Sequence, residues 1–505
     1  MIRKLLFFGV FAVLESGLVW AQNLKVHTIG DSTMADYMEN TTRTRGWGEM
    51  LQEFFSKEVQ VINYARGGRS SRSFWEEGRW DKVKENINPG DYVFIQFAHN
   101  DEKEGGKDGV DFRGTAPWTT YKSFLEMYVD ETKEAGGNPI FITPIVRRYF
   151  DEKGKITSKG CHDLGTIDDD STLNYVKVMK NVARQKKVPV VDMTALTKEF
   201  VEDLGADATI QQIYVPTDGT HTQATGAACY ARIVAHDLVH QGILSEYIDS
   251  EVPMVLNPTS LDFGTIYIGN ESTLCFDVTG LDLSPETGVL SLCAPEGMEF
   301  SLELHSASQR KITIPYTGGK LWNTTLYLHF KPTMAVNVNS SIVITNGNQV
   351  REIPVKAIAK RMSAKKDVTI QSADIQLKGI KKVHDSYTIE SDIWPVDIDE
   401  SGNRYVEFII RNKKENALVL QSLSFLLKGN FCYRIAYARG KDFYPRTDIG
   451  ESQQSNNISD KLVFPINTTI NSDESLHIRL FPWNISGGKM NFQIADWQVQ
   501  GFEIE

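Results

Sequence analysis

The chain has 505 residues, with 54 Lys and Arg against 65 Asp and Glu, so its formal net charge is −11. This length is enough for about three domains, and 41% hydrophobic with 24% charged residues is typical of a folded globular protein. An acidic chain with no basic block interleaved with aromatic residues is a poor partner for nucleic acid or for an anionic membrane. Composition therefore argues against these partners and against a disordered chain, and the function must come from the motifs.

The first 21 residues are typical of a secretory signal peptide. Two basic residues lie in residues 1–4, an apolar run spans Leu5 to Leu14, and Val19-Trp20-Ala21 precedes the polar Gln22. The apolar run is too short to cross a bilayer, which needs about 20 residues. We therefore expect cleavage after Ala21 and an exported mature protein, periplasmic or extracellular, without a membrane anchor.

Short apolar runs alternate with helical periodicity between residues 22 and 250. The expected strands cover residues 25–29, 59–62, 92–97, 140–143 and 188–191. Helical spacing connects Tyr121, Phe124, Leu125, Tyr128 and Val129, and more weakly Leu173, Val176, Lys180 and Ala183. A last helix is expected over residues 225–240. This alternation predicts an α/β domain over residues 22–250, with a parallel sheet covered by helices on both faces.

The long helical patterns stop after residue 252. Short β-rich runs, such as residues 326–330 and 341–345, are then separated by Gly, Pro, Asn and Asp. The basic, small-residue stretch from Lys360 to Lys366 is typical of a linker. We therefore expect two all-β sandwich domains with antiparallel strands, over residues 251–360 and 361–505.

The five cysteines are odd in number and spread over the whole chain, so they form neither a disulfide framework nor a CxxC metal pair. The sequence leaves open whether Cys275 and Cys293 pair or stay free. Cys161-His162-Asp163 has no further ligands at metal-like spacing. We expect no metal and no cofactor.

Polar segments follow the expected strands of the α/β domain where those strands end. Gly30-Asp31-Ser32-Thr33 follows the first strand, residues 63–71 follow the second, and Ala98-His99-Asn100-Asp101 follows the third. Residues 216–221 precede the last expected helix. Because ligands bind beyond the carboxyl ends of the strands in an open parallel sheet, we expect these four segments at one sheet edge.

These segments contain the groups that acyl transfer requires. The hydroxyl of Ser32 is a weak nucleophile unless a base accepts its proton, and His221 is such a base. Asp218 lies three residues before His221, so one turn can present both side chains, with the carboxylate fixing the imidazole tautomer. The expected oxyanion donors are backbone N–H groups beside Ser32 and Gly68, where no Cβ blocks a close approach, and the amide of Asn100.

Four segments resemble the four blocks of the SGNH, or GDSL-like, hydrolases: Gly30-Asp31-Ser32, Gly68, Asn100 and Asp218-Gly219-Thr220-His221. The longer strings around these blocks are similar to the rhamnogalacturonan acetylesterase branch, and the resemblance covers about residues 24–241. It implies a flavodoxin-like three-layer α/β/α fold, a metal-free Ser-His-Asp mechanism and removal of acetyl groups from pectic polysaccharide. Ala98 stands where the third block usually has Gly, which would strain the backbone if its φ were positive.

The substrate contacts are expected near these blocks, because Trp faces stack on sugar rings and Arg binds carboxylates in a bidentate manner. The candidates are Asp31, Trp47, Arg69 and Arg72. For Trp75 and Arg79 we expect packing and loop salt bridges instead. His99 is expected to be a hydrogen-bonded structural residue rather than a second base.

The β-rich half carries two further resemblances. Residues 253–360 resemble an immunoglobulin-like sandwich, which implies a spacer or docking module. Residues 367–505 resemble the galactose-binding-like jelly rolls of carbohydrate-active enzymes, which implies sugar binding or shaping of the hydrolase cleft. Trp394, Trp483 and Trp497 are candidate sugar contacts, although a buried tryptophan is commoner in a sandwich.

The sequence therefore predicts an exported carbohydrate esterase whose partner is an acetylated pectic polysaccharide or oligosaccharide. Two alternatives stay open. A pectin methylesterase would use the same triad on the galacturonate methyl ester, and release of acetate or of methanol from pectin separates these two reactions. A non-catalytic polysaccharide-binding protein on the same scaffold would bind pectin without hydrolysing an ester.

Overall fold

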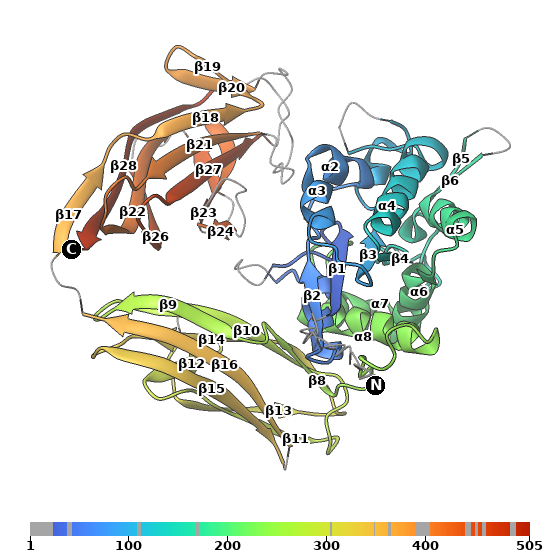
Figure 1. Cartoon of the computed structure of the whole chain (residues 1–505). Coiled ribbons are helices and arrows are strands. Elements are labelled where there is room, and N and C mark those ends of the chain that lie inside the picture. Colours follow the sequence, from blue (N-terminus) through green and yellow to red (C-terminus); the bar gives the residue numbers. More distant parts are fainter. Residues whose placement is uncertain are drawn as a thin grey trace, which may run out of the picture.

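A computed structural model of the chain describes residues 24–504 except 38–42, 109–112, 168–170, 304–305, 348, 362–364, 390–403, 440–445, 450–452, 457–460 and 485–490. The expected signal peptide and Trp394 lie outside the described residues. Figure 1 shows the helices gathered in the N-terminal region, whereas the described residues from 254 onward form strands.

The N-terminal region is built around a five-stranded parallel sheet with the order β2-β1-β3-β4-β7. Its strands are β1 (Leu24–Gly30), β2 (Val59–Asn63), β3 (Tyr92–Gln96), β4 (Asn138–Ile142) and β7 (Val190–Val191). This is the strand order of a flavodoxin-like sheet, in which the connections diverge between β1 and β3. The loops that follow β1 and β3 therefore lie at the switch point, where such sheets bind ligands.

Helices cover both faces of this sheet. They are α1 (Trp47–Met50), α2 (Ser71–Glu76), α3 (Arg79–Lys84), α4 (Lys122–Glu134), α5 (Tyr175–Lys186), α6 (Met193–Leu204), α7 (Ala206–Ala208) and α8 (Ala224–His240). Val26 and Phe94 point into the core that α1, α6 and α8 cover, whereas their neighbours in the sheet, Ile29 and Val93, point into the core beneath α2 to α5. Two separate cores on opposite faces confirm the three-layer α/β/α fold.

Local signals explain the departures from the expected elements. Leu173 was expected on a helix but lies in β6 (Ser171–Asn174), which pairs antiparallel with β5 (Asp163–Ile167). Helix α5 begins after Asn174, because the side chain of Asn174 accepts a hydrogen bond from the backbone N–H of Lys177 and caps the helix. Ala98 is not among the described residues with positive φ, so the alanine adds no backbone strain.

Residues 254–360 form two sheets over one apolar core. Their strands are β8 (Met254–Asn257), β9 (Leu261–Tyr267), β10 (Ser272–Gly280), β11 (Gly288–Cys293), β12 (Met298–Ser301), β13 (Lys311–Tyr316), β14 (Leu321–Phe330), β15 (Val336–Asn346) and β16 (Gln349–Lys360). The orders are β12-β14-β10-β8 and β13-β11-β15-β16-β9. The expectation of purely antiparallel strands is wrong for one pair, since β9 runs parallel to β16. The immunoglobulin-like assignment stays a prediction.

Residues from 365 onward form a second β-rich body over its own core. Its strands are β17 (Lys365–Ile370), β18 (Asp374–Lys378), β19 (Ile380–Val383), β20 (Ser386–Ile389), β21 (Tyr405–Arg411), β22 (Ala417–Lys428), β23 (Asn430–Arg439), β24 (Arg446–Asp448), β25 (Gln453–Asn456), β26 (Leu462–Ile470), β27 (Ser475–Trp483) and β28 (Gln493–Ile504). The jelly-roll assignment stays a prediction. Trp483 is buried, and Trp497 stacks on Phe408 with ring centroids 5.1 Å apart, so both tryptophans contribute to packing.

The first β-rich region docks on the α/β region through α1 and α8. Val255 and Leu281 belong to the same apolar core as residues of α8. A buried ion pair, with Arg45 Nε 2.6 Å from Asp277 Oδ2, crosses between the two regions. The α/β region and the first β-rich region therefore share both apolar and ionic contacts.

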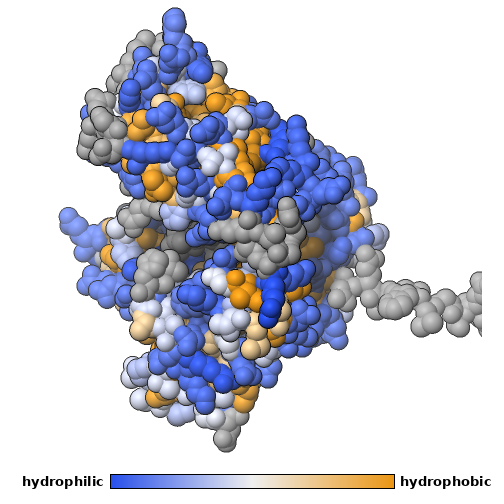
Figure 2. Space-filling view, turned by 90° about the vertical axis from the view of Figure 1, so that its left-hand side faces the viewer, coloured by the Kyte–Doolittle hydropathy of each residue, from blue (hydrophilic) through white to orange (hydrophobic). Residues whose placement is uncertain are grey.

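Figure 2 shows one face of the molecule that is largely hydrophilic, with hydrophobic residues gathered mainly over its upper part. Among the described residues, no helix is both long enough and apolar enough to cross a membrane. All five cysteines are free, so Cys275 and Cys293 form no disulfide.

Candidate active site

Ser32 lies directly after β1, in the loop beyond the carboxyl end of that strand. Its Oγ is 2.8 Å from Nε2 of His221, and the residue is 9% exposed. His221 belongs to the loop just before α8. In the sequence it is 189 positions away from Ser32. The structure therefore brings the expected nucleophile and the expected base within hydrogen-bonding distance.

Asp218 and His221 occupy one turn. Oδ2 of Asp218 is 2.7 Å from Nδ1 of His221, and Oδ1 accepts from the backbone N–H groups of Thr220 at 2.7 Å and of His221 at 3.0 Å. Burial alone would raise the pKa of Asp218, but the hydrogen bond and charge of the imidazole, with both backbone donors, lower it well below its ordinary value. An ionised Asp218 keeps the proton on Nδ1 and leaves Nε2 as an acceptor for the hydroxyl of Ser32.

The glycine turn that carries one expected oxyanion donor, Gly68, lies beside the nucleophile. A Cβ at Gly67 would be 3.8 Å from Cβ of Ser32, which places the Gly67-Gly68 turn next to that side chain. Gly68 has a φ of 76°, a left-handed conformation that glycine adopts without strain. Nδ2 of Asn100 donates to the carbonyl oxygen of Arg69 at 3.0 Å. An amide group has two N–H donors, and the role of the second one of Asn100 as an oxyanion donor stays a prediction.

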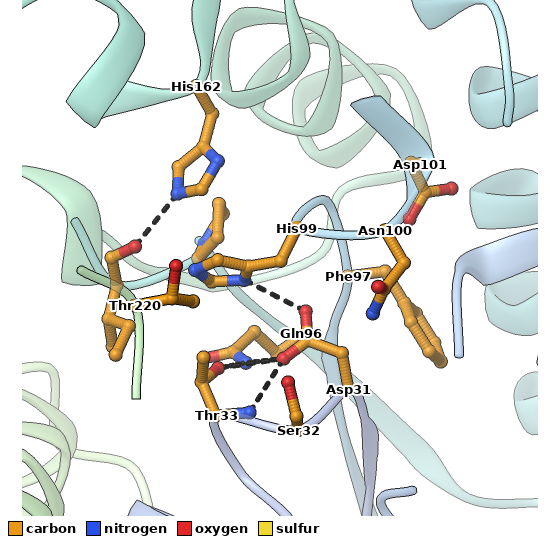
Figure 3. A network of polar contacts seen from close by, with 12 residues as sticks. Asp31, Ser32, Thr33, Gln96, Phe97, His99, Asn100, Asp101, His162 and Thr220 are labelled. Atoms are coloured by element: carbon orange, nitrogen blue, oxygen red, sulfur yellow. Dashed lines mark hydrogen bonds and ion pairs between the residues drawn. The ribbon is translucent and has the colours of Figure 1, made fainter. Parts of the chain in front are cut away.

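Asp31 is the centre of a buried polar network behind Ser32 (Figure 3). Oδ2 of Asp31 accepts from Nδ1 of His99 at 2.9 Å, and Oδ1 accepts from the N–H and Oγ1 groups of Thr33 at 2.9 and 2.8 Å. Burial would raise the pKa of Asp31, but His99 and Thr33 lower it to about 2. The prediction that Asp31 contacts the substrate is wrong, because this carboxylate has no exposed surface. It instead holds the loop that carries Ser32.

Trp47 also supports this loop from inside the protein. Its indole N–H donates to Oε1 of Gln96 at 2.8 Å, and Nε2 of Gln96 donates to Oγ1 of Thr33 at 2.8 Å. The backbone N–H of Trp47 donates to the carbonyl oxygen of Thr33 at 3.0 Å. The prediction that Trp47 stacks on a sugar is wrong, because its side chain is fully buried.

The two arginines near the second block pair with glutamates. Nε of Arg69 is 3.1 Å from Oε2 of Glu77, and Arg69 is 8% exposed, about as much as Ser32 at 9%, so its substrate contact stays a prediction. Nε of Arg72 is 3.0 Å from Oε1 of Glu76 on the same helix. The Arg72 side chain is 27% exposed, so its substrate contact stays a prediction.

The expectations for Trp75, Arg79 and His99 agree with their contacts. Trp75 stacks on Trp80, with ring centroids 6.1 Å apart, and Arg79 pairs with Glu77. His99 is a buried structural residue, as expected, and burial lowers its pKa to about 4, so its ring is neutral at pH 7. Among the described residues, no group of three or more His, Cys, Asp or Glu side chains could hold a metal ion.

Sequence reasoning missed two arginines that hold the His221 loop. Nε of Arg148 donates to the carbonyl oxygen of Asp218 at 2.8 Å, and its backbone N–H donates to the carbonyl oxygen of Gly219 at 2.9 Å. The guanidinium of Arg147 donates to Oγ1 of Thr220. Both arginines follow β4, so the signal that could have found them was the segment after the fourth expected strand, at the same sheet edge as the other blocks.

Comparison with known proteins finds similar proteins for the α/β region. The model of the GDSL-like Lipase/Acylhydrolase family matches residues 28–229. The rhamnogalacturonan acetylesterase RhgT of Bacillus subtilis (strain 168) is 36% identical over 233 residues, which are 44% of this chain and 91% of that protein. The rhamnogalacturonan acetylesterase of Emericella nidulans is 29% identical over 223 residues, covering 43% and 86% of the two chains.

A solved structure, that of YxiM from Bacillus subtilis, is 26% identical, with a TM-score of 0.37, and the likeness covers 44% of this chain and 58% of that one. The match to RhgT extends over nearly all of that relative, and the α/β fold carries the Ser32 and His221 loops at its switch point. The chain belongs to the GDSL-like lipase/acylhydrolase family and is a carboxylic-ester hydrolase.

Proposed function

We propose that the protein is an exported carbohydrate esterase that removes acetyl groups from a rhamnogalacturonan-type pectic polysaccharide through an acyl-enzyme. The observation that carries this proposal is the line of contacts from Ser32 Oγ to His221 Nε2, at 2.8 Å, and from His221 Nδ1 to Asp218 Oδ2, at 2.7 Å. The names of RhgT and of the Emericella nidulans relative, which the chain matches over most of their length, support this substrate class.

The first half of the reaction forms the acyl-enzyme. Oγ of Ser32 attacks the acetyl carbonyl carbon, and its proton passes to Nε2 of His221. Asp218 is ionised and bonded to Nδ1, so it stabilises the imidazolium that forms. The tetrahedral intermediate then collapses, the bond between the acetyl carbon and the sugar oxygen breaks, and Nε2–H returns the proton to that oxygen.

The charge on the intermediate needs donors placed in advance. The carbonyl oxygen becomes an oxyanion beside the backbone N–H groups of Ser32 and Gly68 and the second N–H of Asn100. Removing one such donor typically costs about 100- to 1000-fold in kcat. Asn100 is held by its bond to the carbonyl of Arg69, so its amide does not have to reorient when the charge develops.

The second half of the reaction releases acetate. Water attacks the acetyl-Ser32 ester, Nε2 of His221 takes a proton from this water, and the same proton goes back to Oγ when the acyl bond breaks. The products are the deacetylated sugar and acetate, and the free hydroxyl of Ser32 is restored.

The decisive experiment compares the wild-type protein with Ser32→Ala on acetylated rhamnogalacturonan, acetylated xylan and methylated homogalacturonan. We expect the wild type to release acetate fastest from the first substrate and Ser32→Ala to lose about 10⁴-fold or more of this rate. Methanol release in place of acetate would identify a methylesterase. Binding of pectin with no ester hydrolysis by the wild type would refute an enzymatic role.

Export is tested separately. Expression of the full chain in a bacterial host with fractionation should yield a mature protein whose N-terminal residue is Gln22. An unprocessed protein retained in the cytosol would contradict the proposed export.

A further inference from the structure

The segment that carries His221 is held by backbone hydrogen bonds on both sides. Thr222, the next residue, forms antiparallel bridges with Tyr214 on one side and with Arg45 on the other. The N–H of Arg45 donates to the carbonyl oxygen of Thr222 at 2.8 Å, and Oγ1 of Thr222 donates back to the carbonyl oxygen of Arg45 at 2.7 Å. Because Thr222 follows His221 directly, the position of Arg45 helps to set the position of the imidazole.

Arg45 is in turn fixed by the first β-rich region. Its Nε lies 2.6 Å from Oδ2 of Asp277 on β10, and the two side chains are 4% and 2% exposed. Oγ1 of Thr325 on β14 donates to the other carboxylate oxygen of Asp277 at 2.5 Å. A buried ion pair with its remaining acceptor bonded is a rigid link, because moving either partner leaves an uncompensated charge.

The same region supplies the N-terminal cap of α8, the helix that begins three residues after His221. The side chain of Gln223, at the N-cap position, makes no capping hydrogen bond. Instead, Oδ1 of Asn323 on β14 accepts from the N–H of Thr225 at 2.9 Å, and Oγ1 of Thr225 accepts from the N–H of Asn323 at 2.8 Å. The first N–H groups of a helix need such acceptors, and here a residue from another region provides one.

A further bond joins Asn323 to the helical turn Thr209–Ile213, which precedes the Asp218 turn in the chain. Nδ2 of Asn323 donates to the carbonyl oxygen of Gln212 at 3.0 Å, two residues before the bridge at Tyr214. The backbone of Asn323 has a φ of 41°, a left-handed conformation that asparagine tolerates better than most residues. One side chain thus connects the start of α8 with the chain that leads into the Asp218 turn.

We propose that Asn323 and Asp277 are positioning residues for the esterase reaction and that the first β-rich region holds His221 in line with Ser32. This inference rests on the proposed role of His221 as the general base. Both residues lie beyond residue 229, where the match to the family model ends, so this support is an addition to the matched family segment. The β-rich region then acts as part of the active-site frame and not only as a spacer.

The test needs variants that separate positioning from docking. Asn323→Gly removes the side-chain bonds but keeps a residue that accepts the left-handed φ. Asn323→Asp keeps the oxygen that caps α8. The matched control is Asp282→Asn, because Asp282 pairs with Arg232 on α8, about two turns beyond Thr225. Asp277→Asn is a second, independent variant that weakens the link to Arg45.

Each full-length variant is assayed on an aryl acetate for kcat and KM, and thermal unfolding shows that it is folded. We expect Asn323→Gly and Asp277→Asn to lower kcat about tenfold at unchanged KM, because a small displacement of a catalytic group costs rate and not binding. Asn323→Asp should restore most of kcat. Asp282→Asn should stay within about twofold of the wild type, even where it lowers the Tm as much as Asn323→Gly does.

Equal losses in Asn323→Gly and Asp282→Asn would overturn the inference, because docking alone would then explain them. Unchanged kcat in folded Asn323→Gly and Asp277→Asn would overturn it as well. If Asn323→Gly does not fold, Asp277→Asn alone decides between these outcomes. Ser32→Ala and His221→Ala are measured in the same assay: activity retained by these two would refute the proposed function itself, whereas their inactivity leaves the positioning inference to be judged on its own variants.

Discussion

Replacing Asp218 with Asn changes one atom and isolates the control of the imidazole tautomer. The oxygen that remains can keep both backbone hydrogen bonds, from the N–H groups of Thr220 at 2.7 Å and of His221 at 3.0 Å. The new NH₂ group then faces Nδ1 of His221, where the carboxylate oxygen lay at 2.7 Å. A donor at this place makes Nδ1 the acceptor and puts the imidazole proton on Nε2, which faces Ser32.

An imidazole with its proton on Nε2 cannot accept the proton of Ser32, so the loss should fall on the chemical step. We expect kcat to fall by about 10³- to 10⁴-fold, which corresponds to about 4–5.5 kcal/mol of transition-state stabilisation. The fold should hardly change. The Asp218 side chain is 37% exposed, and at such an exposure the lost ion pair costs about 1 kcal/mol or less of unfolding free energy.

The assay is hydrolysis of an aryl acetate at pH 7, with thermal unfolding of the same samples. The matched control is Asp151→Asn, because Oδ1 of Asp151 also accepts two backbone N–H groups in a turn, those of Lys153 and Lys155, each at 2.9 Å, with no imidazole beside it. We expect this control to keep full activity. A loss of less than tenfold in Asp218→Asn would refute the tautomer argument, and so would an equal loss in the control.

Three further variants test the supporting contacts. Trp47→Phe loses the hydrogen bond to Gln96 and should lower the free energy of unfolding by about 1–2 kcal/mol at unchanged KM. A KM raised several-fold would show that Trp47 contacts the substrate after all. Arg148→Met loses the hydrogen bond to the carbonyl oxygen of Asp218 and should lower kcat about tenfold. Unchanged kcat would show that the turn from Asp218 to His221 keeps its shape without Arg148. His99 has a folded pKa of about 4 against 6.5 when unfolded, so its stabilising contribution is complete above pH 6.5. Urea unfolding should therefore show the wild type losing more stability than His99→Asn as the pH falls from 6.5 to 4. Equal losses in the two proteins would contradict this account.

The convergence of the site could be predicted from the sequence because the sheet itself produces it. Parallel strands end at one edge, so chemistry-bearing residues directly after successive strands meet there whatever their distance in the chain. Ser32 after β1 and Asn100 after β3 follow this rule. Asp218 and His221 follow a second one, since residues three apart in a turn present their side chains together.

The substrate contacts could not be predicted in the same way, because a sequence does not show which side of a loop faces the protein. Asp31 is adjacent to Ser32, and neighbouring side chains at the end of a strand point in opposite directions. Once Ser32 points toward His221, Asp31 points inward to His99. Trp47 lies near the first block in sequence, but its partner Gln96 holds it inside the fold.

The contacts between the regions leave only a weak signal in the sequence. Asp277 is an acidic residue in the apolar strand segment between Phe276 and Val278, and a charge in such a run needs a buried partner. The sequence does not identify this partner, because Arg45 is 232 positions away and belongs to another region. Asn323 lies in an Asn-Thr-Thr glycosylation sequon that does not indicate this contact, and its capping role depends on how β14 meets α8.

A three-residue segment connects both halves of the site. Arg45 pairs with Thr222 beside His221, and the N–H of Trp47 donates to the carbonyl of Thr33 beside Ser32 at 3.0 Å. Gly46 lies between them, and a Cβ there would be 2.3 Å from the carbonyl oxygen of Ala35, so only glycine lets this segment lie so close to the nucleophile loop. This short segment thus helps to set the distance between the hydroxyl of Ser32 and the imidazole of His221. Because the β-rich region holds Arg45 at one end of it, a shift of that region is transmitted to the relative position of the two reacting groups.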